Sequence, residues 1–380
     1  METNRLAMGP QNTQKIAVFL SFSWTGGVER MLFKLCEAFA DNGYPVDLLL
    51  IKTLDSKSPM LPTNVNIIHL NAASTLASLP ALIHYIKTRR PAVLLAAKDR
   101  ANRAAVLAKM LSTVPFRLIL RMGTHTSTFL AEKSLMARYA RFLPMKWLYP
   151  KADGIVAIST GVAADLAKIT GINVSDIHII PNPTVSPEIH GLAEHPVDHP
   201  WLAEKTLPVI MGAGRLTRQK DFGTLIRAFA LLRKRMPVRL IILGEGNRRK
   251  DLTALAAELG VSGDIDLVGF VRNPYAYMKK ADLFVLSSIW EGLGNVLIEA
   301  LALGVPVVST DCPSGPREIL NNGAFGFLVP VGDAAEMAGA MSQTLRSPLS
   351  AADLATAASP YHLDKSASAY LKLLIGAPAA

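Results

Sequence analysis

The chain has 380 residues, of which 50% are apolar, only two cysteines, and a formal net charge of +10 at pH 7. Its length predicts two domains rather than one core, and Cys36 and Cys312, on separate segments, exclude a disulfide framework and a cysteine-pair zinc site. Residues 1–14 lack the apolar core of a signal peptide and no uncharged apolar run reaches 18 residues, so we expect a soluble cytoplasmic protein.

The first half of the chain alternates apolar segments with amphipathic ones. We expect strands at 16–21, 46–52, 67–70, 93–97, 118–121, 155–158 and 177–180, and helices at 29–42, 74–88, 103–111, 135–149 and 162–169. This alternation predicts parallel βαβ units. We assign residues 1–183 to this first domain. Residues 184–207, rich in proline and without periodicity, are the predicted linker.

A second alternating series begins at residue 208. We expect strands at 209–213, 239–243, 265–268, 283–286, 305–309 and 326–329, with helices at 222–236 and 247–259 between them. This second domain is expected to span residues 208–358. Residues 359–380 carry a last predicted helix, at 365–375, that would return to the first domain. The predicted fold class is therefore α/β, with two doubly wound, Rossmann-like domains facing each other across a cleft.

The positive charge is concentrated between Lys87 and Lys151. This segment contains fourteen Lys or Arg residues and two acidic ones, Asp99 and Glu132. Within it, residues 133–151 interleave basic side chains with large aromatic and aliphatic ones, a pattern that suits an anionic membrane surface. Nucleic acid is a competing partner, and an ordinary solvated helix face is the third interpretation. We favour the membrane surface and expect no nucleic-acid partner.

Glycines follow the first strand of each domain, and in the second domain cations accompany them. Gly26 and Gly27 open a helix whose backbone N–H groups could meet an anion, although a plain tight turn has the same pattern. In the second domain Gly214 precedes three cations within six residues, among them Arg215 and Lys220. A forked guanidinium beside an ammonium group suits a diphosphate. A solvated charge cluster is the alternative.

Two carboxylates flank a glycine turn after the strand at 283–286. Glu291 precedes the turn, and Glu299 follows eight residues later on a helix. Helical rise places residues at that spacing about 12 Å apart, whereas a retaining glycoside hydrolase needs its two carboxyl groups about 5 Å apart. The pair therefore suits two contacts to one long ligand. Ligands of open α/β sheets bind at this edge of the sheet.

The remaining motifs give weaker signals. The glycines of Gly244-Glu245-Gly246 lack the third glycine of a dinucleotide fingerprint, so we interpret them as a cleft-lining turn. Asp264 and Asp266 match a metal-binding D-x-D pattern but enter a strand, and we predict no metal. His125 follows the strand at 118–121, where catalytic and structural roles stay equally open. A serine nucleophile elbow, HExxH and a Walker A loop are absent from the sequence, which leaves hydrolase and ATPase chemistry without support.

In this order the motifs resemble those of retaining nucleotide-sugar glycosyltransferases of the GT-B fold, in group 1 (family 4). The resemblance covers nearly the whole chain and rests on Gly26-Gly27, IHIIPNP, GRLTRQKD, GEGNRR, the segment from Glu291 to Glu299, DCPSGPREIL and GFLVPVGD. It implies transfer of a hexose or N-acetylhexosamine from a nucleotide sugar, with a UDP-sugar favoured. The implied acceptor is lipid-linked or a polysaccharide of the bacterial surface. Neither a metal nor another cofactor is expected.

The resemblance also implies roles for individual residues. Arg215 and Lys220 would hold the donor diphosphate, Glu291 would position the transferred sugar, and His125 would complete the catalytic set. Glu299 would accept hydrogen bonds from the ribose hydroxyls. The remaining donor contacts would come from Gly26, Gly27, Gly214, Gly269, Phe270, Gly292, Leu293, Gly294, Asn295 and Val296. Leu293 stands where relatives often have Phe.

The implied reaction retains the configuration of the sugar, because the acceptor attacks from the face that the nucleoside diphosphate leaves. Two other functions remain open from the sequence. A GT-B sugar-nucleotide epimerase would need acid–base residues that we cannot identify. A non-enzymatic, two-domain sugar-binding protein of the exported kind would need a signal peptide and would have no use for Arg215 and Lys220.

Overall fold

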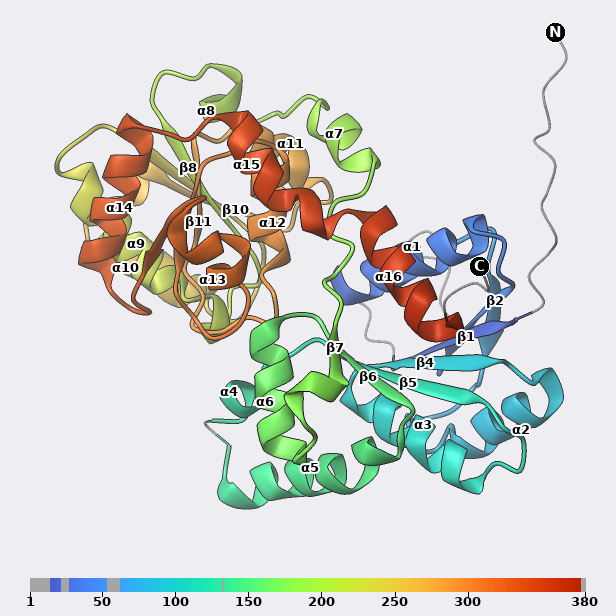
Figure 1. Ribbon diagram of the computed structural model, residues 1–380. Helices are drawn as coiled ribbons and strands as arrows, with labels where there is room; N and C mark the ends of the chain where they lie inside the picture. Colours follow the sequence, from blue (N-terminus) through green and yellow to red (C-terminus); the bar gives the residue numbers. More distant parts are fainter. Residues whose placement is uncertain (1–13, 22–26, 53–61, 132, 377–380) are drawn as a thin grey trace, which may run out of the picture.

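The computed structural model describes residues 14–21, 27–52, 62–131 and 133–376. In these residues each half of the chain builds its own parallel sheet with helices around it (Figure 1). The predicted fold class, two Rossmann-like α/β domains, is confirmed.

In the described residues the first sheet has the strand order β3-β2-β1-β4-β5-β6-β7, with all pairs parallel. Its strands are β1 (Ile16–Leu20), β2 (Val46–Leu50), β3 (Asn66–His69), β4 (Val93–Ala97), β5 (Arg117–Met122), β6 (Gly154–Ala157) and β7 (Ile177–Ile179). Every residue of β1, β2 and β4 is buried, because helices cover both faces of the sheet. This burial on both faces explains why the strands are continuous apolar runs in the sequence.

The described helices of the first domain are α1 (Gly27–Asp41), α2 (Leu79–Arg89), α3 (Asp99–Leu111), α4 (Thr126–Phe129), α5 (Leu135–Leu148) and α6 (Thr160–Thr170). Five of them correspond to predicted ones, although α3 begins four residues earlier than predicted, and the short helix α4 was not predicted. The prediction of a helix at 74–88 was wrong at its start. Pro80 lies in the first turn of α2, where its missing N–H is tolerated, but in a helix begun at Ser74 its ring would clash with a carbonyl one turn back.

The second sheet, within the described residues, has the order β10-β9-β8-β11-β12-β13 and is also parallel. Its strands are β8 (Val209–Ala213), β9 (Arg239–Leu243), β10 (Ile265–Gly269), β11 (Leu283–Leu286), β12 (Val307–Thr310) and β13 (Phe327–Val329). Its helices are α9 (Phe222–Arg233), α10 (Arg249–Glu258), α11 (Pro274–Lys279), α12 (Asn295–Ala302), α13 (Pro316–Ile319), α14 (Ala334–Arg346) and α15 (Ala351–Ala358). β12 begins two residues later than predicted, since Pro306 has no N–H for the ladder.

The chain passes between the domains twice, and the two passages lie side by side. The first runs through the predicted linker, residues 184–207, which contains two short helices that the sequence did not reveal, α7 (Glu188–Ala193) and α8 (Pro200–Ala203). The second leads from α15 to α16 (Leu363–Ile375). Val185 joins the passages in a parallel bridge with His362: its N–H donates to the Tyr361 carbonyl at 3.0 Å, and its carbonyl accepts from Leu363 at 2.9 Å.

The last helix returns to the first domain, as predicted. In Figure 1 α16 lies alongside α1. The rings of Phe39 and Tyr370 meet edge to face with their centroids 6.3 Å apart, and the Ser366 hydroxyl donates to the Pro181 carbonyl at 3.1 Å. The C-terminal helix is therefore part of the core of the first domain.

Candidate active site

The loops that follow β5 and β11 meet between the two sheets. A β-carbon on Gly292 would lie 2.2 Å from the carbonyl oxygen of Gly123 across the domain boundary, so this contact requires glycine. The hydroxyl of Ser159, which also caps α6, donates to the Gly292 carbonyl at 2.6 Å. The carboxyl edges of both sheets therefore face one junction, where ligands of such sheets bind.

Lys220 and Glu291 form the central ion pair of this junction. The Lys220 ammonium lies 2.6 Å from Oε1 of Glu291, and their side chains are 15% and 9% exposed. The hydroxyl of Ser288 donates to the same oxygen at 2.7 Å. A carboxylate buried to this degree requires such partners, because desolvation without them is strongly unfavourable. The structure thus brings together two of the residues that the sequence identified.

The loop that carries Lys220 is fastened to the loop that carries Glu291. The Lys220 carbonyl accepts from the Ser287 hydroxyl at 2.7 Å, and the Gln219 carbonyl accepts from the backbone of Ile289 at 2.8 Å. The Gln219 amide in turn donates to the Trp290 carbonyl at 3.0 Å. These bonds fix the backbone from which the Lys220 side chain reaches Glu291.

Gly214 and Arg215 complete this end of the site. The aliphatic part of Lys220 crosses Gly214 so closely that a β-carbon there would lie 3.0 Å from its Cε. Arg215 is exposed and forms no ion pair with any residue that the structure describes. A free guanidinium beside a fixed ammonium leaves positive charge available for an anion.

Glu299, on α12, is partly buried and receives charge from both domains. Burial raises its pKa to about 7, although Arg30, a hydrogen bond from Tyr275 and Lys220 each act to lower it. The Tyr275 hydroxyl donates to Oε1 of Glu299 over 3.4 Å, and the nearby Glu299 charge, with burial, raises the pKa of Tyr275. Arg30 lies on α1, three residues beyond Gly27, so the start of α1 is close to this carboxyl group.

A polar relay also links the domains beside α12. Arg121, at the end of β5, is fully buried and donates to Oδ1 of Asn182 at 2.5 Å. The amide nitrogen of Asn182 donates to Oδ1 of Asn295 at 2.9 Å. Asn295 is the first residue of α12 and follows Gly294, the N-cap, which has φ +96°. The position of α12 is thus tied to a buried cation of the first domain.

The other predicted donor contacts lie around this centre. Leu293 is buried beneath the glycine turn and Val296 lies in the first turn of α12. Gly269 ends β10, and Phe270 beyond it is 73% exposed. Gly27 is the first residue of α1, whereas Gly26 falls outside the described residues.

His125 lies at the end of the loop that touches Gly292. It caps α4: its Nδ1 accepts from the Thr128 backbone at 3.5 Å and lies 2.9 Å from the Thr128 hydroxyl. Nδ1 is also 3.6 Å from Oδ1 of Asp165. The other carboxylate oxygen of Asp165, Oδ2, accepts from two backbone N–H groups of α4. These contacts fix the ring orientation, as either a structural or a catalytic histidine would require.

The two carboxylates of the D-x-D motif pair with protein side chains. Asp264 accepts from Nε of Arg233 at 2.9 Å, and Asp266 lies 3.2 Å from Nε2 of His199. Among the residues that the structure describes, no group of three or more His, Cys, Asp or Glu side chains could hold a metal ion. This motif therefore has a structural explanation at the entry to β10.

Four residues of the site escaped the sequence analysis: Arg30, Arg121, Asn182 and Tyr275. Two of them carried a readable signal. Arg121 ends an otherwise apolar strand just before His125, and Asn182 stands between two prolines after the strand at 177–180. Arg30 carried none, because it acts on Glu299 only once the two domains have come together. Tyr275 carried none, because its hydroxyl reaches Glu299 only through the packing of α11 and α12.

Comparisons with known proteins identify the relatives of this chain. A family model described as "Glycosyltransferase Family 4" matches residues 25–184, and one described as "Glycosyl transferases group 1" matches residues 198–359. The chain is 35% identical over 233 residues to N-acetylgalactosamine-N,N'-diacetylbacillosaminyl-diphospho-undecaprenol 4-alpha-N-acetylgalactosaminyltransferase of Campylobacter jejuni, an alignment that covers 61% of each chain. It is 34% identical over 236 residues to the lipopolysaccharide core biosynthesis glycosyltransferase LpsE of Rhizobium meliloti, which covers 60% of this chain and 66% of that one.

The fold likeness extends further than the sequence likeness. The structure of Anabaena HepE in complex with UDP superposes with a TM-score of 0.76 at 19% identity, and covers 95% of this chain and 100% of that chain. By contrast, the sequence alignment spans only 61% of the length of the Campylobacter relative. The first comparison concerns the arrangement of the two domains, and the second concerns residues that can be aligned one by one.

Proposed function

Because the chain belongs to the group 1, family 4 glycosyltransferases, we propose that it transfers a hexose or N-acetylhexosamine from a UDP-sugar to a lipid-linked or polysaccharide acceptor in bacterial surface-glycan assembly. The observation that carries this proposal is the fixed Lys220–Glu291 pair beside the unpaired Arg215, at the junction of two carboxyl sheet edges. The names of the Campylobacter and Rhizobium relatives support the acceptor class.

In the proposed reaction the acceptor hydroxyl attacks the anomeric carbon from the face that UDP leaves, so configuration is retained. The bond between the anomeric carbon and the diphosphate oxygen breaks as the new glycosidic bond forms, and the leaving phosphate takes the acceptor proton. Lys220 and Arg215 meet the charge that develops on the diphosphate. We propose that the reaction uses no metal, since these two side chains supply the positive charge. Glu291 positions the sugar, and Glu299 binds the ribose.

Replacement of either end of the donor site tests the proposal. We expect Lys220→Ala and Glu299→Ala each to lower sugar transfer at least tenfold, because an interaction with the leaving diphosphate or the ribose is lost. UDP release and product formation would be measured with a panel of sugar nucleotides, starting with UDP-N-acetylhexosamines, and the anomeric configuration of the product would be read by NMR.

Lys250→Ala is the matched control, since Lys250 is exposed on α10, and thermal melting would establish that each variant is folded. Turnover equal to wild type in Lys220→Ala or Glu299→Ala would contradict the site assignment. An epimerized sugar nucleotide without transfer, or tight binding without UDP release, would identify the two alternative functions.

We further propose that α5 docks on the anionic cytoplasmic face of a membrane. Its exposed apolar side chains recur at helical spacing, with Met136 83%, Tyr139 69%, Leu143 55% and Trp147 69% exposed. Basic residues such as Lys146 flank this stripe. Aromatic and basic residues on one helix surface favour the interface of an anionic bilayer. In the part of the chain that the structure describes, every helix falls short of the length and apolarity needed to span a bilayer.

Liposome co-sedimentation tests this docking surface. We expect binding to rise with the fraction of anionic lipid, to weaken with salt, and to fall at least fivefold in the variant Tyr139→Ser/Trp147→Ser, which loses apolar area without losing charge. Phe270→Ser, which removes an exposed aromatic residue from the second domain, is the control. Binding that is indifferent to anionic lipid would refute the membrane assignment.

A further inference from the structure

A cavity of about 690 Å³ lies in the first domain and uses none of the active-site residues named above. Its walls come from the segments after β2 and β3 and from helices α3 and α5. The side chains that give it its chemistry are Lys52, Leu76, Arg100, Arg103, Leu107 and Leu148. The cavity therefore combines cationic with apolar side chains.

The cationic side chains of the cavity carry charge that no carboxylate of its described lining compensates. Lys52 and Arg100 are exposed and form no ion pair with a residue that the structure describes, and none of the described residues that line the cavity is acidic. The carboxylate nearest to Arg103 is that of Asp99, at 2.8 Å.

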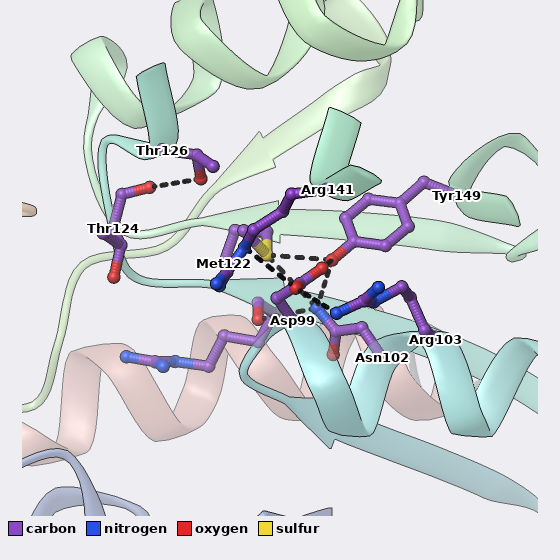
Figure 2. A network of polar contacts seen from close by, with 9 residues as sticks. Asp99, Asn102, Arg103, Met122, Thr124, Thr126, Arg141 and Tyr149 are labelled. Atoms are coloured by element: carbon purple, nitrogen blue, oxygen red, sulfur yellow. Dashed lines mark hydrogen bonds and ion pairs between the residues drawn. The ribbon is translucent and has the colours of Figure 1, made fainter. Parts of the chain in front are cut away.

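Asp99 does not neutralise the positive charge of the cavity. Its buried carboxylate also meets Nε of Arg141 at 3.1 Å and accepts from the Tyr149 hydroxyl at 2.9 Å. Figure 2 shows both guanidinium groups and the hydroxyl converging on it. Two arginines share one carboxylate, so the cluster keeps a net positive charge, and the α3 side of the cavity is held to α5.

The apolar residues that α5 contributes to the cavity lie next to the exposed apolar residues of the same helix. Pro144 and Leu148 line the cavity, and Leu143 and Trp147, the residue before each of them, project to the outside. Leu76, from the segment after β3, also lines the cavity and is 66% exposed. An apolar ligand that left the cavity would thus pass directly onto the surface that we assign to the membrane.

We propose that this cavity binds the diphosphate and the first isoprene units of a polyprenyl-diphosphate-linked acceptor. The inference rests on the proposed function and adds the acceptor class to it. Lys52, Arg100 and Arg103 would bind the diphosphate, since guanidinium and ammonium groups suit its charge, while the leucines would contact the chain.

The topology connects the cavity with the reaction. Lys52 follows β2, Arg100 follows β4 and His125 follows β5, and the sheet is parallel across these strands. The carboxyl ends of parallel strands share one edge. A saccharide attached to the diphosphate would therefore extend along this edge toward the junction of the domains, where the donor sugar lies in the proposed reaction.

Isothermal titration calorimetry of the full-length protein with farnesyl diphosphate tests whether the cavity binds this ligand, and it does not require turnover. We expect binding to weaken at least tenfold in Lys52→Ala/Arg100→Ala and in Leu107→Gln, and to be unchanged in Lys234→Ala/Arg235→Ala. The last variant loses the same charge from exposed positions of the second domain. Inorganic diphosphate should bind at least tenfold more weakly than farnesyl diphosphate. Equal affinity for the two compounds, or unchanged binding in Lys52→Ala/Arg100→Ala, would overturn the inference.

Kinetics with an undecaprenyl-diphosphate-linked N-acetylhexosamine separate this inference from the proposed function. We expect Lys52→Ala/Arg100→Ala to raise the acceptor KM at least tenfold and to leave the donor KM unchanged. If the wild type transfers sugar and the acceptor KM does not move, the cavity is not the acceptor site although the function stands. If the wild type binds farnesyl diphosphate in the cavity but transfers no sugar from any donor, the proposed function fails and the binding site remains.

Discussion

Lys220 and Glu291 stabilise each other at a position where neither side chain is well solvated. Removing one member of a buried ion pair leaves the other charge without its partner, which typically costs about 3–5 kcal/mol. Ser288 remains as a donor to Glu291 in that case, so we expect the lower part of this range for Lys220→Ala. A bound diphosphate would compete with Glu291 for the same ammonium group. The pair therefore also presets the ammonium position before the donor arrives.

The raised pKa of Glu299 predicts a pH-dependent donor affinity. The ionised carboxylate accepts hydrogen bonds from ribose hydroxyls better than the neutral acid, and its pKa is about 7 in the free protein. Between pH 8 and pH 6 most of the carboxylate becomes protonated, so the donor Kd should increase, by about tenfold if only the ionised form binds. Calorimetric titration with UDP-sugar across this range measures the change.

Glu299→Gln provides the comparison for that titration, because its side chain cannot ionise. In this variant the donor Kd should be flat between pH 6 and pH 8, at a value close to that of the wild type at low pH. The groups that face Glu299 are Arg30, Tyr275 and Lys220. A wild-type profile that is equally flat would show that Glu299 does not bind the donor in its ionised form.

At this scale the sequence was informative wherever a residue acts through its neighbours in the chain. The run from Gly214 to Lys220 predicted a cation loop, and the residues from Glu291 to Glu299 predicted a second loop at a strand end. The charge that Arg30 places near Glu299 could not be predicted. It depends on α1 meeting α12, which lies more than 250 residues later in the sequence.

Helix α16 is the element that packs the last part of the described chain into the core of the first domain. Tyr370 is 1% exposed and packs against Phe39, so Tyr370→Ala should destabilise the protein by about 3–5 kcal/mol through cavity formation. Differential scanning calorimetry should show a lower Tm. Tyr139→Ala, on the exposed stripe of α5, should shift stability by no more than about 0.5 kcal/mol. Similar melting curves for the two variants would contradict the assignment of α16 to this core.

The elements themselves were predictable to different extents for physical reasons. Strands buried on both faces are apolar runs, and the thirteen strands of the described residues correspond to the predicted ones. Helices α7 and α8 were missed because a turn or two beside proline shows no periodicity. Their stability comes from tertiary contacts instead, such as the bond from the Asn273 amide to the Leu192 carbonyl at 2.8 Å, which holds α7 to the second domain.

At the scale of the whole molecule, the two domains contact each other along the carboxyl edges of their sheets, where the proposed donor site lies. Besides the Ser159–Gly292 and Asn182–Asn295 bonds, the backbone of Thr160 donates to Glu318 at 3.0 Å. No sequence pattern could have predicted these contacts, because each one joins two surfaces that are complementary only after both domains have folded. Closure of domains over a substrate is a common catalytic step.

Gly292→Ala tests whether this contact is needed for turnover. The added methyl group would lie 2.2 Å from the Gly123 carbonyl, so the domains cannot approach as closely. We expect kcat to fall at least tenfold, because the loops that carry the donor site and the first domain are then held apart. Gly339→Ala, a helical glycine with open space around it, is the control. A normal kcat in Gly292→Ala would show that chemistry does not require the close approach.

The parallel bridge between Val185 and His362 also restricts how the halves can separate. The two passages of the chain cannot separate at this point without breaking two backbone hydrogen bonds. A protease that severed one passage would therefore leave both halves attached through the other, and the nicked protein should still sediment as a single particle.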